Sequence, residues 1–111
     1  QRLYNSFSPD HGNEPELNYE DQITDKEIEV LVHRIKRTES YIKEILFKEM
    51  KIGTLNEEDK LFKESAREAY HQYSDRLLTV CIICAREKRN LPNLPRGIEV
   101  ARSIFPDVEI A

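Results

Sequence analysis

The chain has 111 residues, which is enough for one domain with one hydrophobic core, and 34% of them are charged. Its three glycines and its lack of tryptophan argue against a turn-rich β-sandwich. The net charge of −4 argues against a protein whose whole surface is built to bind nucleic acid.

The N-terminal residues differ in composition from the rest of the chain. Residues 1–23 are rich in Ser, Asn, Pro and Asp and show no apolar periodicity, so we predict an extended arm there and a helical domain over 24–111. Residues 1–30 carry eight acidic and two basic residues, whereas 31–111 carry thirteen acidic and fifteen basic residues. The sequence therefore predicts an acidic arm on a slightly basic body.

Residues 25–51 and 57–90 each carry one apolar stripe at helical spacing, and a short segment with Gly53 separates them. The first helix has a clear start, because Thr24 and Glu27 have the spacing of a capping box. The second begins near residue 56, where three acidic residues suit the positive end of a helix dipole. The sequence predicts an all-α fold, an antiparallel helical hairpin that a partner chain could complete to a bundle.

The two stripes define the faces that we expect to pack against each other. The stripe of the first helix is predicted to contain Ile28, Leu31, Val32, Ile35, Ile42, Leu46 and Met50, with Thr38 and Ile45 at its edge. The stripe of the second is predicted to contain Phe62, Ala66, Ala69, Tyr73, Leu77, Val80 and Cys84.

Residues 77–85 are apolar around the whole helix, so one facing helix cannot bury them. Pro92 and Pro95 prevent the second helix from continuing, and a short third helix is predicted from Pro95 to Phe105. We expect the third helix, or a partner protein where that cover is incomplete, to bury this segment. The predicted docking surface consists of Leu78, Ile82, Ile83, Leu94, Ile98 and Phe105.

Two basic clusters lie far apart in the sequence, at residues 33–37 and 86–89. An antiparallel hairpin that turns near Gly53 brings both toward its open end, where Arg96 and Arg102 could join them. A phosphate backbone or an acidic protein surface could bind there. The predicted basic patch consists of Arg34, Lys36, Arg37, Arg86, Lys88 and Arg89.

Two short motifs suggest chemistry that their context does not support. Cys81 and Cys84 have the spacing of a redox motif but lie inside a predicted helix, so we expect them to pack in the core. Glu68 and His71 have the spacing of a di-iron motif but lie about 140–160° away from the apolar stripe, so we expect them to face solvent. We predict no catalytic residue, metal site or cofactor.

The first hypothesis is a non-catalytic protein–protein interaction or assembly subunit of a larger complex, which binds a partner or a second copy. The alternative is a nucleic-acid-binding helical module that uses the basic open end of the hairpin. An all-α enzyme is a third and weaker possibility, since no nucleophilic triad or Gly-rich phosphate loop is present. With two cysteines and no bilayer-length apolar run, we expect an intracellular protein, in the cytoplasm or in an organelle after removal of a targeting segment.

Overall fold

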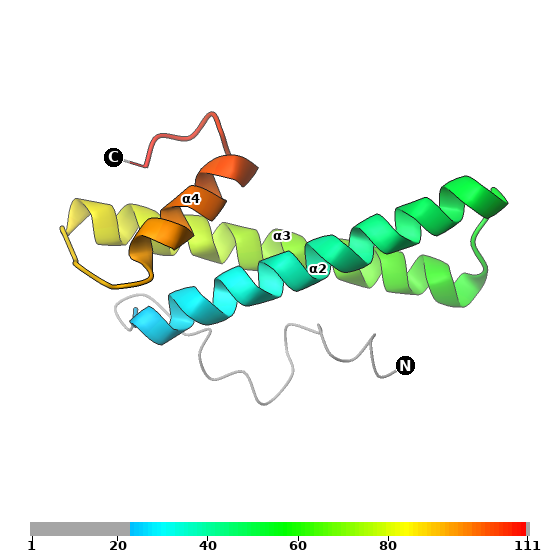
Figure 1. The fold of residues 1–111 in the computed structure, drawn as a ribbon, viewed down its shortest axis with the longest axis horizontal. Helices are drawn as coiled ribbons and strands as arrows, with labels where there is room; N and C mark the ends of the chain where they lie inside the picture. The colour runs from blue at the N-terminus through cyan, green and yellow to red at the C-terminus, as the bar shows by residue number, and fades with distance from the viewer. Residues whose placement is uncertain (1–22, 111) are drawn as a thin grey trace.

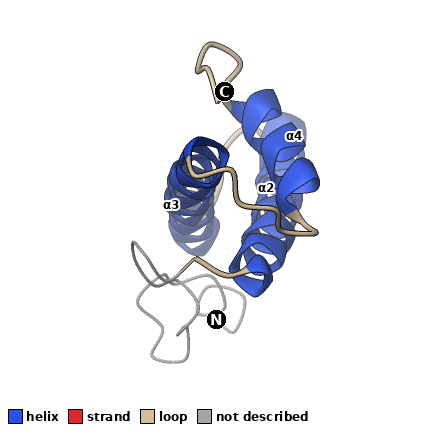
Figure 2. Cartoon of the chain, turned by 90° about the vertical axis from the view of Figure 1, so that its left-hand side faces the viewer, coloured by secondary structure: helices blue, strands red, loops and turns tan. Residues whose placement is uncertain are grey.

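The computed structural model describes residues 23–110, so the predicted arm lies outside the described residues except for Ile23. The described part of the chain contains α2 (Asp25–Ile52), α3 (Glu57–Arg86) and α4 (Leu94–Ile104), and it contains no strand. The two long helices α2 and α3 run antiparallel, and α4 packs against both near the end where α2 begins (Figures 1 and 2). The predicted all-α hairpin with a short third helix is confirmed.

Three of the four ends of the two long helices lie where the local sequence predicts. The hydroxyl of Thr24 accepts a hydrogen bond from the Glu27 amide at 3.1 Å, and the Asn56 side chain accepts one from the Asp59 amide at 2.7 Å. Gly53 ends α2 at φ 92°, a conformation that side-chain-bearing residues rarely adopt, and its N–H donates to the Glu49 carbonyl at 2.8 Å.

The fourth boundary, the C-terminal end of α3, differs from the prediction, because α3 ends at Arg86 rather than at residue 90. Lys88 adopts a left-handed conformation with φ 56°. Its N–H donates to the carbonyl of Ala85, and the N–H of Arg89 donates to the carbonyl of Cys84. These two bonds form a Schellman motif, which ends a helix even when its left-handed residue is not glycine.

One hydrophobic core contains residues of α2, α3 and α4, together with residues just before α2 and after α4. The predicted stripe of α3 is buried except for Phe62, which is partly exposed. The core cluster contains Ile23, Ile28, Leu31, Val32, Ile35, Ala66, Ala69, Tyr73, Leu77, Val80, Cys81, Cys84, Leu94, Val100, Ala101 and Ile110. The segment that follows α4 therefore returns to the core through Ile110, which the sequence pattern does not indicate.

The predicted stripe of α2 is wrong in its second half. Thr38 and Ile45, placed at the edge of the stripe, are buried, whereas Leu46 and Met50 are 45% and 77% exposed. The inward positions of α2 are 28, 31, 35, 38, 42 and 45, in alternating steps of three and four residues. Such a pattern drifts by about 20° every seven residues relative to a straight helix, so a straight projection misplaces the packed face after three turns.

Gly97 allows α4 to approach both long helices closely. A methyl group on its Cα would lie 2.9 Å from Ile28 Cγ2, 3.5 Å from Leu77 Cδ1 and 3.6 Å from Cys81 Sγ. The loop before α4 is fixed by Asp25, whose carboxylate accepts hydrogen bonds from the backbone and side-chain N–H groups of Asn93, both at 2.7 Å.

We expect Gly97→Val to lower the free energy of unfolding by about 1–3 kcal/mol, because the β-branched side chain must displace Ile28 in a packed core. Urea denaturation followed by circular dichroism measures the change. Arg102→Val places the same side chain at an exposed position of α4 and controls for helix propensity. Equal unfolding midpoints for the two variants would show that α4 does not need the close approach.

Candidate functional site

Cys81 and Cys84 lie in the core, as predicted, and neither is exposed to solvent. Burial, with a smaller contribution from Cys84, raises the pKa of the Cys81 thiol to about 12. The pKa of the Cys84 thiol is also raised, mainly by burial. Thiolates are the reactive form of cysteine, so both side chains act as small apolar groups in the core, where Cys81 lies close to Gly97 of α4.

We expect a maleimide or Ellman's reagent to label the folded chain slowly at pH 7–8 and to label both thiols quickly in denaturant. Raising the pH to about 9 should speed labelling of the denatured chain far more than that of the folded chain, because the pKa of the folded Cys81 thiol is about 12 and both folded thiols are shielded from the reagent. Stopped-flow absorbance measures both rates. Fast stoichiometric labelling of the folded chain would contradict core packing.

Glu68 and His71 are exposed on α3, as predicted. The Nε2 atom of His71 lies 3.5 Å from a carboxylate oxygen of Asp75, a neighbour on the same helix. Within residues 23–110, no three His, Cys, Asp or Glu side chains come together in a group that could hold a metal ion.

Four of the six residues predicted to form a docking surface lie in or against the core of the chain itself. Leu94 is buried in the core cluster, and the other five are partly buried. Three of these five pack against the cluster: Leu78, Ile83 and Ile98. The apolar segment 77–85 is therefore covered largely from within the chain, by α2 and by the C-terminal residues.

A different apolar surface is exposed, on the half of α2 near the hairpin turn. Leu46, Phe47 and Met50 are 45%, 58% and 77% exposed. At 100° per residue these three side chains span an arc of about 100°, so they form one continuous face, which we call the distal face. Ile52 is also exposed but lies about 160° from Met50 around the helix axis. The alternating three–four spacing of α2 could have revealed the distal face, because it moves Leu46 and Met50 out of the core.

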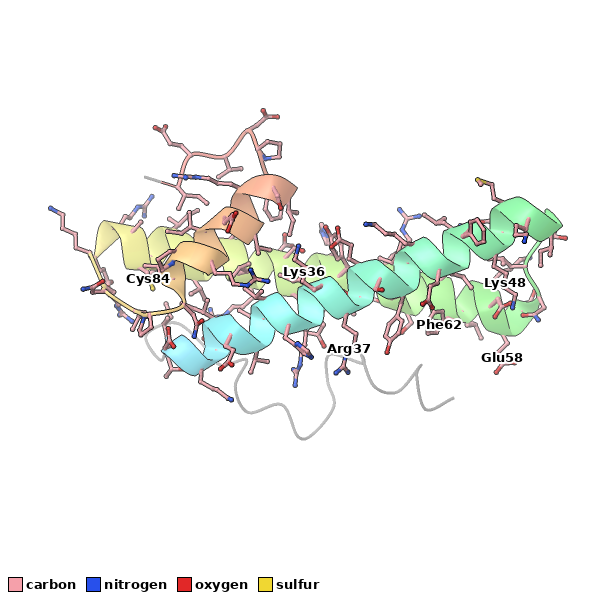
Figure 3. All side chains as sticks on the ribbon, viewed as in Figure 1. Lys36, Arg37, Lys48, Glu58, Phe62 and Cys84 are labelled. Atoms are coloured by element: carbon pink, nitrogen blue, oxygen red, sulfur yellow. The ribbon has the colours of Figure 1, made fainter. Side chains whose placement is uncertain are left out.

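Ion pairs join α2 to α3 on the side away from the distal face. Lys48 Nζ lies 2.6 Å from Asp59 Oδ2, and Lys63 Nζ lies 2.8 Å from Glu49 Oε1. Figure 3 shows Lys48 and Glu58 near the turn and Lys36 and Arg37 near the middle of the molecule. Lys51 lies beside the distal face, with its Nζ 5.4 Å from the centroid of the Phe47 ring.

The two predicted basic clusters do not come together. The Arg34 guanidinium lies 5.9 Å from the centroid of the Tyr73 ring, so the first cluster is level with Tyr73 on α3. Arg86 lies more than three turns further along α3, about 20 Å away at 1.5 Å per residue. Of the predicted patch, Arg34, Lys36 and Arg37 lie near the middle of the molecule, whereas Arg86, Lys88 and Arg89 lie at the far end of α3.

Arg96 of α4 joins the first cluster instead. A hollow of about 270 Å³ between α2 and α4 is lined by Glu29, Val32, His33, Lys36, Asn93 and Arg96. A neighbouring hollow of about 330 Å³ shares Glu29 and His33. Its other lining residues are Lys26, Val30, Arg34, Arg37, Thr38 and Tyr73. We call the basic residues around both hollows the α2–α4 basic surface: Lys26, Arg34, Lys36, Arg37 and Arg96.

One carboxylate, that of Glu29, lies among the residues that line the two hollows. Glu29 lies 3.6 Å from Lys26 Nζ in an exposed pair, which solvent screens strongly. Burial raises the pKa of the Tyr73 hydroxyl, and the positive charges of Arg34 and Arg37 oppose that rise. The surface could attract an anion, but Glu29 weakens its field at the point where the two hollows meet.

Each of the three helices in residues 23–110 is either too short or too polar to cross a membrane. No family model matches the sequence, and neither a curated protein nor a solved structure is significantly similar to it.

Proposed function

We propose that this protein is a non-catalytic interaction and assembly subunit that binds other protein chains through its helical hairpin. The observation that carries the proposal is the distal face, where three adjacent large apolar side chains are exposed. Full burial of a large apolar side chain contributes about 1.5–3 kcal/mol, and each of these three forgoes the share that corresponds to its exposed part. A partner helix that covered the face would recover part of this free energy.

The hairpin is also suited to binding without rearrangement. The Lys48–Asp59 and Lys63–Glu49 pairs hold the two helices together close to the turn, and Leu55 is buried within it. A face on a preformed helix loses little conformational entropy when it binds, which favours affinity for a given contact area.

The proposal is tested by immobilising the full chain, exposing it to native extract and quantifying retained proteins by mass spectrometry. We expect specific proteins that bind wild type and are lost with Phe47→Glu. Leu61→Glu is the matched control, because Leu61 is 53% exposed on α3 and is not part of the distal face. Circular dichroism verifies that both variants are folded. Retained proteins that respond equally to the two variants would contradict binding through the distal face.

The α2–α4 basic surface favours nucleic-acid binding as a second candidate function. Its five basic side chains come from two helices and surround two adjoining hollows. Contacts to phosphates release counterions, so affinity for RNA or DNA should fall steeply as salt rises. Fluorescence anisotropy with single-stranded RNA and duplex DNA, comparing wild type with the Lys36→Ala/Arg96→Ala double variant, measures this. Absence of binding at low salt would exclude it.

A further inference from the structure

We propose that the occupant of the distal face is a second copy of this chain, with the two α2 helices packed antiparallel about a twofold axis. This inference rests on the proposed function and names its partner. On the outer face of α2 the exposed apolar residues Phe47 and Met50 are three residues apart, and Ser40 and Lys43, which precede them at steps of three and four, are polar. The apolar part of this face is therefore confined to the last turns of α2.

The apolar side chains are self-complementary in this arrangement. In an antiparallel twofold pair centred between residues 48 and 49, Phe47 lies opposite Met50 of the second copy, and Met50 lies opposite Phe47. These are the most exposed apolar side chains of the distal face, at 58% and 77%. Leu46 lies on one flank of the contact and enlarges its apolar area.

The charges on the other flank select the same register. Glu44 and Lys51 are seven residues apart and so lie on the same side of α2, next to Phe47. In the antiparallel pair Glu44 comes within reach of Lys51 of the second copy, and twofold symmetry repeats this ion pair. A parallel pair would place the Glu44 and Lys51 flanks of the two copies on opposite sides of the contact, so neither ion pair could form.

The charge pattern favours a second copy over an anionic membrane. Glu57 and Glu58 are exposed beside the turn, where they would meet the headgroups if the end of the hairpin entered a bilayer. The contact involves one helix from each chain and is smaller than the roughly 800 Å² per partner of a standard stable complex. We therefore expect a weak, concentration-dependent dimer.

Sedimentation equilibrium of the full chain tests the inference at concentrations from about 10 μM to 1 mM, a range suited to a weak dimer. We expect Glu44→Lys and Lys51→Glu each to weaken dimerisation at least about tenfold, because each variant places two like charges opposite each other twice. An equimolar mixture of the two variants should form a heterodimer, since one chain then carries two positive charges on this flank and the other two negative charges.

Two variants complete the design. Lys60→Glu makes the same charge change on the exposed surface of α3 and should dimerise like wild type. Phe47→Glu should remain monomeric in every mixture. A monomeric wild type throughout the range, or single variants that dimerise as well as wild type, or no recovery on mixing, would overturn the inference.

The results separate this inference from the proposed function. A chain that stays monomeric but still captures other proteins in a Phe47-dependent manner overturns self-association and leaves the interaction function standing. A chain that dimerises as described supports the inference, whether or not other proteins are captured.

Discussion

Arg76→Met is expected to lower the free energy of unfolding by about 3–5 kcal/mol, because it leaves a buried carboxylate without its partner. The Glu27 side chain is only 1% exposed. Arg76 donates from Nε to Glu27 Oε2 at 2.7 Å and from Nη2 to Oε1 at 3.2 Å, so the two groups form a bidentate pair. Urea denaturation followed by circular dichroism measures the loss, which is a large fraction of the stability of a small domain.

The double variant Glu27→Leu/Arg76→Met separates the buried charge from the loss of contacts. It removes both charges, and we expect it to be more stable than Arg76→Met alone, because apolar side chains of similar size replace buried ion pairs with little loss. Lys60→Ala is the exposed control. It removes an ion pair with Glu57 in which both side chains are more than half exposed, and it should change stability by less than about 1 kcal/mol. An Arg76→Met chain as stable as this control would contradict the buried pair.

The Glu27–Arg76 pair marks the limit of what the sequence of α2 predicts. The capping box correctly places the start of the helix, since the Thr24 hydroxyl and the Glu27 amide are three residues apart and their contact is local. In a capping box the carboxylate of Glu27 reaches back to the helix start, but here both of its oxygens accept from Arg76, which is 49 residues away. No spacing rule connects residues so distant in sequence.

The distal face shows a second limit. The apolar pattern correctly predicts which segments are helical. For α3 it also predicts the buried side of the helix, because small errors at single positions hardly change the mean direction of the apolar stripe. It misplaces Leu46 and Met50, because the packed side of α2 turns gradually along the helix and the error grows with length. Two of the three residues of the distal face, Leu46 and Met50, are residues that a straight projection assigns to the core.

The basic residues show a third limit. A turn near Gly53 sets the hairpin register, and Arg34 lies beside Tyr73. Residues 86–89 stay apart from the first cluster, because Arg86 lies thirteen residues further along α3 than Tyr73. Arg96 reaches Lys36 only because Gly97 and the Asp25–Asn93 contact fix α4 against α2, and that arrangement depends on tertiary packing.

Leu77→Ala is expected to lower the free energy of unfolding by about 2–5 kcal/mol, through lost burial and the cavity that remains. Leu77 is fully buried and lies where α2, α3 and α4 meet, within van der Waals distance of the site of Gly97. Ile35→Ala should have an effect in the same range, because Ile35 is 1% exposed in the same core. Urea denaturation measures both.

Leu61→Ala is the matched control for Leu77→Ala, since Leu61 is on the same helix and is 53% exposed. Its removal should change the unfolding free energy by less than about 0.5 kcal/mol, the usual range for surface positions.

The comparison of Leu77→Ala with Leu61→Ala also tests whether the three helices share one core. If Leu77 joins three helices, its loss should lower stability without lowering the cooperativity of unfolding, because α4 and the hairpin share one core. Two separate transitions in wild type, or a Leu77→Ala chain as stable as Leu61→Ala, would show that α4 does not belong to the folded unit.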